Sequence, residues 1–141
     1  MEAKELLDAI MHINRKFSDA TWVKGQNGNV LSYTALKLAA MKAYLVDEKE
    51  TAQKAMLQAE IDMETAKGAA YLRLKAEHGA TAATDAKNTD EEYIAAKKAF
   101  ADKKVYYDKL KSVVADSHDL IESIRSRIID LQGARKDESI R

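Results

Sequence analysis

The sequence predicts an all-α protein, and three observations lead to that class. The 141 residues include no proline, only five glycines and 33% charged residues. Hydrophobic residues make up 46%, but alanine supplies much of that share and aromatic residues are only 6%. This composition is typical of long helices and coiled coils. Apolar residues also recur at helical spacing, so we expect a single helical domain over residues 1–141.

Residues 2–17 are expected to form a short amphipathic helix. Its apolar positions recur every three or four residues and would share one face: Leu6, Leu7, Ile10, Ile13 and Phe17. The following segment contains Asn27-Gly28, a strong turn signal. A small hairpin that pairs Trp22-Val23 with Val30-Leu31 is one possibility here, although isolated hairpins are marginally stable. Residues 1–31 would then be an N-terminal helix and a loop.

Residues 32–77 are expected to form one long helix. Only Gly68 interrupts the pattern, and a glycine costs about 1 kcal/mol relative to alanine without ending a helix. One set of positions recurs at spacings of three, four and seven: Leu38, Leu45, Ala52, Met56, Ala59, Met63, Ala66 and Ala70. Small residues dominate this set, so a partner helix could approach closely along its second half.

A second long helix is expected over residues 90–132, after a loop at 78–89. Thr89 and Glu92 have the spacing of a capping box at its start. Apolar residues then recur every seven positions, which defines the a set of a heptad: Tyr93, Phe100, Tyr107, Val114, Ile121 and Ile128. The d set of the same heptad follows: Ala96, Lys103, Leu110, Ser117, Ile124 and Leu131. Residues 133–141 would form a tail.

The two long helices should fold back on each other, because one loop joins them. The expected fold is a short N-terminal helix plus a long antiparallel two-helix hairpin that resembles a coiled coil. Tyr106, Val113 and Leu120 occupy g positions and widen the apolar stripe beyond the need of two strands. The N-terminal helix could cover part of this stripe and another subunit the rest, so we predict a homo-oligomer.

Enzymatic chemistry finds little support in the residues. The chain has no cysteine, and its three histidines fall on three different expected segments with no common metal-ligand spacing. No Glu-x-x-His pair of the di-iron bundle type occurs, and neither does the glycine spacing of a phosphate-binding loop. We therefore expect no catalytic residues, no metal and no cofactor.

Basic residues concentrate in one segment of this electrically neutral chain. Residues 78–92 have one basic and four acidic residues, whereas residues 93–111 have six basic and two acidic. The heptad places a basic stripe at its e positions: Lys97, Lys104, Lys111, His118 and Arg125. One interpretation is that these side chains pair with acidic residues of a neighbouring helix. The other is an electrostatic track for a nucleic-acid backbone, which Lys98, Lys103 and Lys109 would widen.

Aromatic residues that could stack on bases are few. Single-strand binders combine a basic groove with accessible aromatic faces. The aromatic residues at a positions are expected in the core, which leaves Tyr106 as the stacking candidate in the basic segment. Tyr71, near Arg73 and Lys75 at the end of the first long helix, forms a second candidate cluster.

Three stretches resemble one family, the UvsY-like recombination mediators of tailed phages. "LSYTALKLAAMKAYLVDEKETAQKAMLQAEID" is similar to the first long helix of that family. "AYLRLKAEHG" ends this helix with basic residues before the loop, and "EEYIAAKKAFADKKVYYDKLKSVVADSHDLIESIRSRIIDLQGARKDE" is similar to the last helix. The likeness covers about 110 residues and consists of pattern rather than an invariant motif. Only Arg73 and Lys75 match the basic pair with which the family binds DNA, in reversed order.

The resemblance implies a ring-like homo-oligomer that binds single-stranded DNA without catalysis. Its further partners would be a RecA-like recombinase and a single-strand-binding protein. The alternative is a helical-hairpin module that binds proteins and ignores DNA, such as a phage inhibitor, a scaffold or an adaptor. We expect a cytoplasmic location, in the host cell if a phage encodes the protein. No membrane partner is expected, since no stretch approaches eighteen apolar residues and the first residues lack the pattern from which we would expect a signal peptide.

Overall fold

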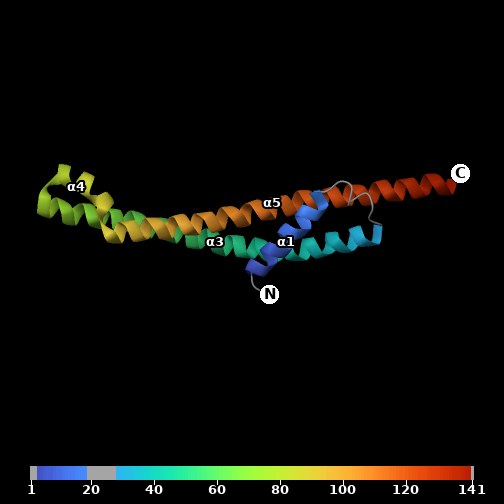
Figure 1. Cartoon of the computed structure of the whole chain (residues 1–141), viewed down its shortest axis with the longest axis horizontal. Coiled ribbons are helices and arrows are strands. Elements are labelled where there is room, and N and C mark those ends of the chain that lie inside the picture. The colour runs from blue at the N-terminus through green and yellow to red at the C-terminus, as the bar shows by residue number, and fades with distance from the viewer. Residues whose placement is uncertain (1–2, 19–27, 141) are drawn as a thin grey trace. The chain divides into compact units, whose positions relative to one another are not determined.

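The computed structural model describes residues 3–18 and 28–140 (Figure 1). These residues are helical apart from Gly79 and Asp90, which confirms the all-α prediction. The elements in chain order are α1 (Ala3–Ser18), α3 (Gly28–His78), α4 (Ala80–Ala86), the 3-10 helix η1 (Lys87–Thr89) and α5 (Glu91–Ile140). The short first helix and the two long helices were expected from the sequence.

The chain divides into two compact units. We call Met1–Glu48 with Leu110–Arg141 the terminal unit, and Lys49–Lys109 the hairpin unit. Helices α3 and α5 each contribute residues to both units.

The terminal unit has a core of large aliphatic side chains. The buried residues come from all three of its helices: Leu6, Leu7 and Ile10 of α1, Leu31, Leu38, Met41 and Leu45 of α3, and Leu110, Val113, Val114, Ile121 and Ile124 of α5. Ser117 is fully buried among them, and its Oγ donates a 2.7 Å hydrogen bond to the carbonyl of Val113. This bond satisfies the one polar side chain that the described core buries.

The hairpin unit has a much thinner core. Helix α3 reverses into α5 through α4 and η1, so the two long helices run antiparallel in this unit (Figure 1). Its buried hydrophobic residues are Ala52, Ala70, Ala83 and Tyr93. The predicted small-residue seam of α3 thus faces the partner helix, with Met56, Ala59, Met63 and Ala66 half-buried.

The predicted heptad of α5 is confirmed by burial. All six a residues are buried or half-buried, and so are the d residues except Lys103, which is exposed. The N-terminal helix shows the same agreement at Leu6, Leu7 and Ile10, whereas the side chain of Phe17 lies outside the described part. Among the g residues Val113 is buried, Leu120 is half-buried, and Tyr106 is 38% exposed.

The predicted loop over residues 78–89 is wrong, because α4 and η1 occupy it. Gly79 separates α3 from α4 with a φ of 88° and a ψ of 166°, a conformation that is essentially restricted to glycine. The Gly79 amide donates to Lys75 O, and the Gly79 carbonyl accepts from the Ala83 amide, both at 3.0 Å. The segment that follows is rich in alanine, the strongest helix former, so a short helix forms there.

The predicted capping box at Thr89 is also wrong, because Asp90 caps α5. Asp90 Oδ2 accepts the Tyr93 amide at 3.0 Å, and the Asp90 carbonyl accepts the Ile94 amide at 2.9 Å. Thr89 Oγ1 instead donates to the carbonyl of Ala86 at 2.7 Å. Aspartate is among the best N-cap residues, and Glu91 and Glu92 in the first turn also favour this helix end.

The long helices extend beyond their predicted ends. Helix α3 starts at Gly28 instead of Ser32, so Val30 and Leu31 are helical and cannot form the strand of a hairpin. Trp22 and Val23, the other expected strand, lie outside the described residues. Helix α5 continues to Ile140, well past Gln132. None of the helices in the described ranges combines the length and the apolar composition needed to cross a membrane.

Candidate nucleic-acid interface

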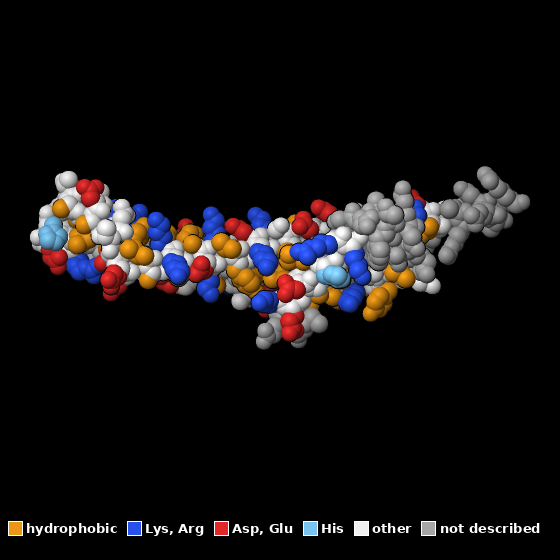
Figure 2. Space-filling view, viewed as in Figure 1, with side chains coloured by type: hydrophobic (Ala, Val, Ile, Leu, Met, Phe, Trp, Pro, Cys, Tyr) orange, Lys and Arg blue, Asp and Glu red, His pale blue; other side chains and the backbone are white. Residues whose placement is uncertain are grey.

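The basic side chains of α5 in the hairpin unit point away from its core. Lys97 and Lys104 are exposed, as are the neighbouring lysines 98, 103 and 109. The described part of the chain forms no ion pair with Lys97 or Lys104. Figure 2 shows basic side chains at intervals along the face in view, with acidic ones among them. The hairpin unit therefore presents ammonium groups to solvent that an external anion could contact.

The remaining e positions belong to the terminal unit. Lys111, His118 and Arg125 follow one another at intervals of seven on α5, and all three are exposed. Lys111 also has no ion pair within the described residues.

A groove in the terminal unit adds a basic residue that sequence reasoning missed. The groove measures about 310 Å³ and is lined by Ala39, Lys42, Ala43 and Val46 of α3 and by His118, Ile121, Glu122 and Arg125 of α5. Lys42 Nζ lies 3.0 Å from His118 Nδ1, and Arg125 Nη1 lies 3.0 Å from Glu122 Oε1. One signal was available: position 42 lies four residues after Leu38 and three before Leu45, so its side chain flanks the buried seam.

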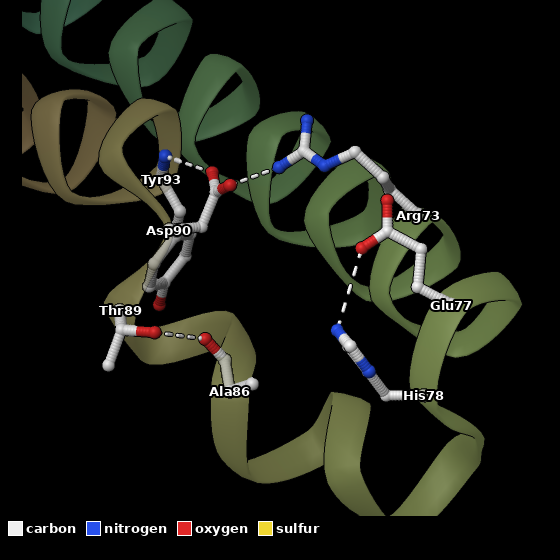
Figure 3. A network of polar contacts seen from close by, with 7 residues as sticks. All are labelled: Arg73, Glu77, His78, Ala86, Thr89, Asp90 and Tyr93. Carbon is white, nitrogen blue, oxygen red and sulfur yellow. Dashed lines mark hydrogen bonds and ion pairs between the residues drawn. The ribbon is translucent and has the colours of Figure 1, made fainter.

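Arg73, which the sequence predicts as a DNA contact, has a partner within the hairpin unit. Its guanidinium pairs with the carboxylate of Asp90, the residue that caps α5 (Figure 3). A hollow of about 450 Å³ beside this pair is lined by Arg73, Leu74, Ala86 and residues 89–92. Asp90, Glu91 and Glu92 line this hollow together with the single guanidinium, so the negative charges outnumber the positive one and disfavour phosphate there. Figure 3 also shows His78 close to Glu77, with Nε2 and Oε2 3.6 Å apart.

The second basic cluster consists of Lys75 and Tyr71, four residues apart on α3. Lys75 Nζ lies 6.0 Å from the centroid of the Tyr71 ring, at the limit of a cation–π contact. Lys75 is exposed and Tyr71 is half-buried. Lys75 forms no ion pair within the described residues, whereas the guanidinium of Arg73 is paired with Asp90.

Tyr106 is the accessible aromatic residue of the basic segment. Tyr93 is buried, and Phe100 and Tyr107 are half-buried, as expected for a positions. Helical spacing places Tyr106 beside Lys103 and Lys109, each three residues away, whereas the e-position lysines flank the opposite side of the seam. The structure therefore does not gather all predicted residues into one site.

Large apolar side chains lie on the outer surface of the hairpin unit. Leu57, Ile61 and Leu72 of α3 are 46%, 59% and 66% exposed, and Val105 of α5 is 69% exposed. A hollow of about 640 Å³ is lined by Leu57, Glu60, Ile61, Glu64 and Thr65. The sequence did not predict this apolar surface, because a heptad pattern identifies the residues that face the partner helix and not those on the outer face.

The described ranges contain no group of three or more histidine, aspartate or glutamate side chains placed to hold a metal ion. Comparisons with protein-family models, with curated proteins and with solved structures give no match.

Proposed function

We propose that this protein is a non-catalytic recombination mediator that binds single-stranded DNA through its phosphates. The observation that supports DNA binding most directly is the pair Lys97 and Lys104. Both are exposed without an acidic partner in the described structure, while the neighbouring a residues Tyr93, Phe100 and Tyr107 are buried or half-buried. Assistance in loading a RecA-like recombinase, next to a single-strand-binding protein, rests on the resemblance to UvsY-like mediators.

The contacts that we assign differ from the sequence-based set in one respect. Lys97, Lys104, Lys75 and Lys111 are assigned to phosphates, and Tyr106 and Tyr71 to base stacking. Arg73 is not assigned to phosphate, because its guanidinium is paired with Asp90 and lines a hollow with Glu91 and Glu92.

The test is a titration of a fluorescent single-stranded oligonucleotide with the protein at several salt concentrations. If three to five phosphates are neutralised per subunit, log affinity falls against log salt with a slope of roughly 2 to 3.5. The double variant Lys97→Glu/Lys104→Glu should bind at least tenfold more weakly. The control Lys37→Glu/Lys54→Glu changes the net charge equally at exposed positions of α3 and should bind almost as the parent does.

Two results would contradict this proposal. One is the absence of binding by the parent protein at micromolar concentration and low salt. The other is an affinity that does not change with salt, because phosphate contacts release counterions. Equal losses of DNA affinity in the two double variants would show that binding depends only on the net charge of the protein. The assignment of the phosphate contacts to the lysines of α5 would then be wrong.

A protein-binding helical module is the second candidate. The exposed Leu57 and Ile61 and the hollow that they line favour it, since exposed apolar patches mark protein contacts. A second copy of the chain is the partner that we propose for this surface, which would make the protein a homo-oligomer. A protein-binding module need not bind DNA, so the oligonucleotide titration distinguishes the two candidate functions.

A further inference from the structure

We propose that the groove of the terminal unit binds a phosphate monoester, the group present in a 5′-phosphorylated strand end and, as the free ion, in inorganic phosphate. The groove is distinct from the lysines assigned above, and Lys42, His118 and Arg125 are its basic residues. The claim that the phosphate comes from a DNA strand end rests on the proposed function. The claim that the groove binds inorganic phosphate is independent of the proposed function.

The hydrogen bond between Lys42 and His118 determines which ring nitrogen of His118 can donate a hydrogen bond to a ligand. An ammonium group only donates, so the bond of 3.0 Å makes His118 Nδ1 the acceptor. The proton of the neutral imidazole is then on Nε2, which becomes a donor. Lys42 keeps further N–H groups, and so does Arg125, because Glu122 takes only Nη1 of a guanidinium with five N–H donors. Three different side chains from two helices thus line one groove and keep N–H donors for an anion.

The size of the groove suits a small anion. Its volume of about 310 Å³ is at the low end of ligand pockets, which span about 300–1,000 Å³. Ala39 and Ala43 in its lining leave this space between the longer basic side chains.

The number and charge of the donors favour a monoester over a diester. A monoester has three terminal oxygens and a charge of about −1.5 to −2 at pH 7, so three donors can each contact one oxygen. A diester offers only two such oxygens and a single charge. Lys42 and Arg125 supply two positive charges and Glu122 removes one, so a carboxylate limits the affinity of this groove.

The test uses the full-length protein and inorganic phosphate, at ionic strength kept constant with chloride. Phosphate should shift the side-chain NMR signals of His118 in a saturable manner, and chloride alone should not. Lys42→Gln should weaken phosphate binding at least tenfold, while Lys37→Gln, at an exposed position of the same helix, should leave it unchanged. Glu122→Gln should tighten binding several-fold, a gain that misfolding cannot imitate.

An oligonucleotide arm identifies the source of the phosphate. A strand with a 5′-phosphate should bind more tightly than the same strand with a 5′-hydroxyl, and Lys42→Gln should abolish the difference. Equal binding of the two strands, with saturable binding of the free ion, would overturn the strand end as the source. No saturable shift with inorganic phosphate, or unchanged binding by Lys42→Gln, would overturn the site itself. Failure of both strands to bind would overturn only the proposed function.

Discussion

Asp90 connects the start of α5 to α3 through one carboxylate. One oxygen accepts the amide of Tyr93, and the other pairs with Arg73. The first contact satisfies a backbone donor that the helix end leaves open. The second contact joins two helices of the hairpin unit, although Arg73 is 46% exposed and an exposed ion pair contributes little.

Replacement of Asp90 separates these two contacts. Asp90→Ala should lower the free energy of unfolding by about 1–2 kcal/mol, because it removes the cap and the ion pair. Asp90→Asn should cost less than about 1 kcal/mol, since asparagine caps a helix as well as aspartate does. Urea unfolding followed by circular dichroism measures both, with Asp102→Ala at an exposed position of α5 as the control. Equal losses for alanine and asparagine would show that the cap contributes nothing.

Two glycines should respond in opposite directions to the same substitution. Gly68 lies within α3, and a Cβ added there would meet no atom within 4 Å, so Gly68→Ala should stabilise the protein by about 1 kcal/mol. Gly79 has equal space, but its φ of 88° is rarely adopted by other residues, so Gly79→Ala should destabilise by about 1–3 kcal/mol. Thermal unfolding of both variants compares them directly. A stabilising Gly79→Ala would show that this conformation is not required.

At the scale of elements, the heptad of α5 made the largest part of the fold predictable. A period of seven sustained from Tyr93 to Ile128 constrains which face is buried, whatever lies opposite. The break at Gly79 and the cap at Asp90 were harder to place, because they depend on individual backbone hydrogen bonds. Thr89 and Asp90 both have suitable side chains for a cap, and the sequence alone does not decide between them.

The candidate site was less predictable than the fold. Exposure of Lys97 and Lys104 followed from their heptad position. The pairing of Arg73 with Asp90 joins α3 to the cap of α5, and the contact of Lys42 with His118 joins α3 to α5 itself. Such contacts depend on the axial register between α3 and α5, which a periodic pattern leaves open by whole heptads.

Two isoleucines of α5 in the terminal unit test the assignment of its faces. Ile124 is 1% exposed at a d position, and Ile129 is 65% exposed. Ile124→Ala should cost about 2–5 kcal/mol because it leaves a cavity in the core. Ile129→Ala, the same change in the same helix, should stay within about 0.5 kcal/mol of the parent. Chemical unfolding monitored by circular dichroism gives both values. Similar losses at the two positions would mean that Ile129 is covered in solution.

At the scale of the whole molecule, the two units should differ in stability. The terminal unit buries leucine, isoleucine and valine side chains from three helices, whereas three of the four hydrophobic residues buried in the hairpin unit are alanines. Hydrophobic stabilisation scales with buried apolar area, about 25 cal/mol per Å². Amides of residues 52–76 and 94–108 should therefore exchange with solvent faster than those of residues 34–46 and 112–126, as hydrogen-exchange mass spectrometry or NMR can measure. Uniform protection in dilute solution would contradict this difference.

Self-association through the outer surface of the hairpin unit would reduce the difference in amide exchange between the two units. Leu57 and Ile61 are exposed on α3, and the chain has no net charge to keep copies apart. Sedimentation equilibrium should therefore give a mass above the 15.7 kDa of one chain, and amide protection in the hairpin unit should rise with protein concentration. Leu57→Gln/Ile61→Gln should return the protein to a single chain, whereas Leu36→Gln/Ile129→Gln, at exposed positions of the terminal unit, should not. A parent protein that sediments as a single chain at all concentrations would rule out this surface as a self-contact, and its exposed leucine and isoleucine would then need a different partner.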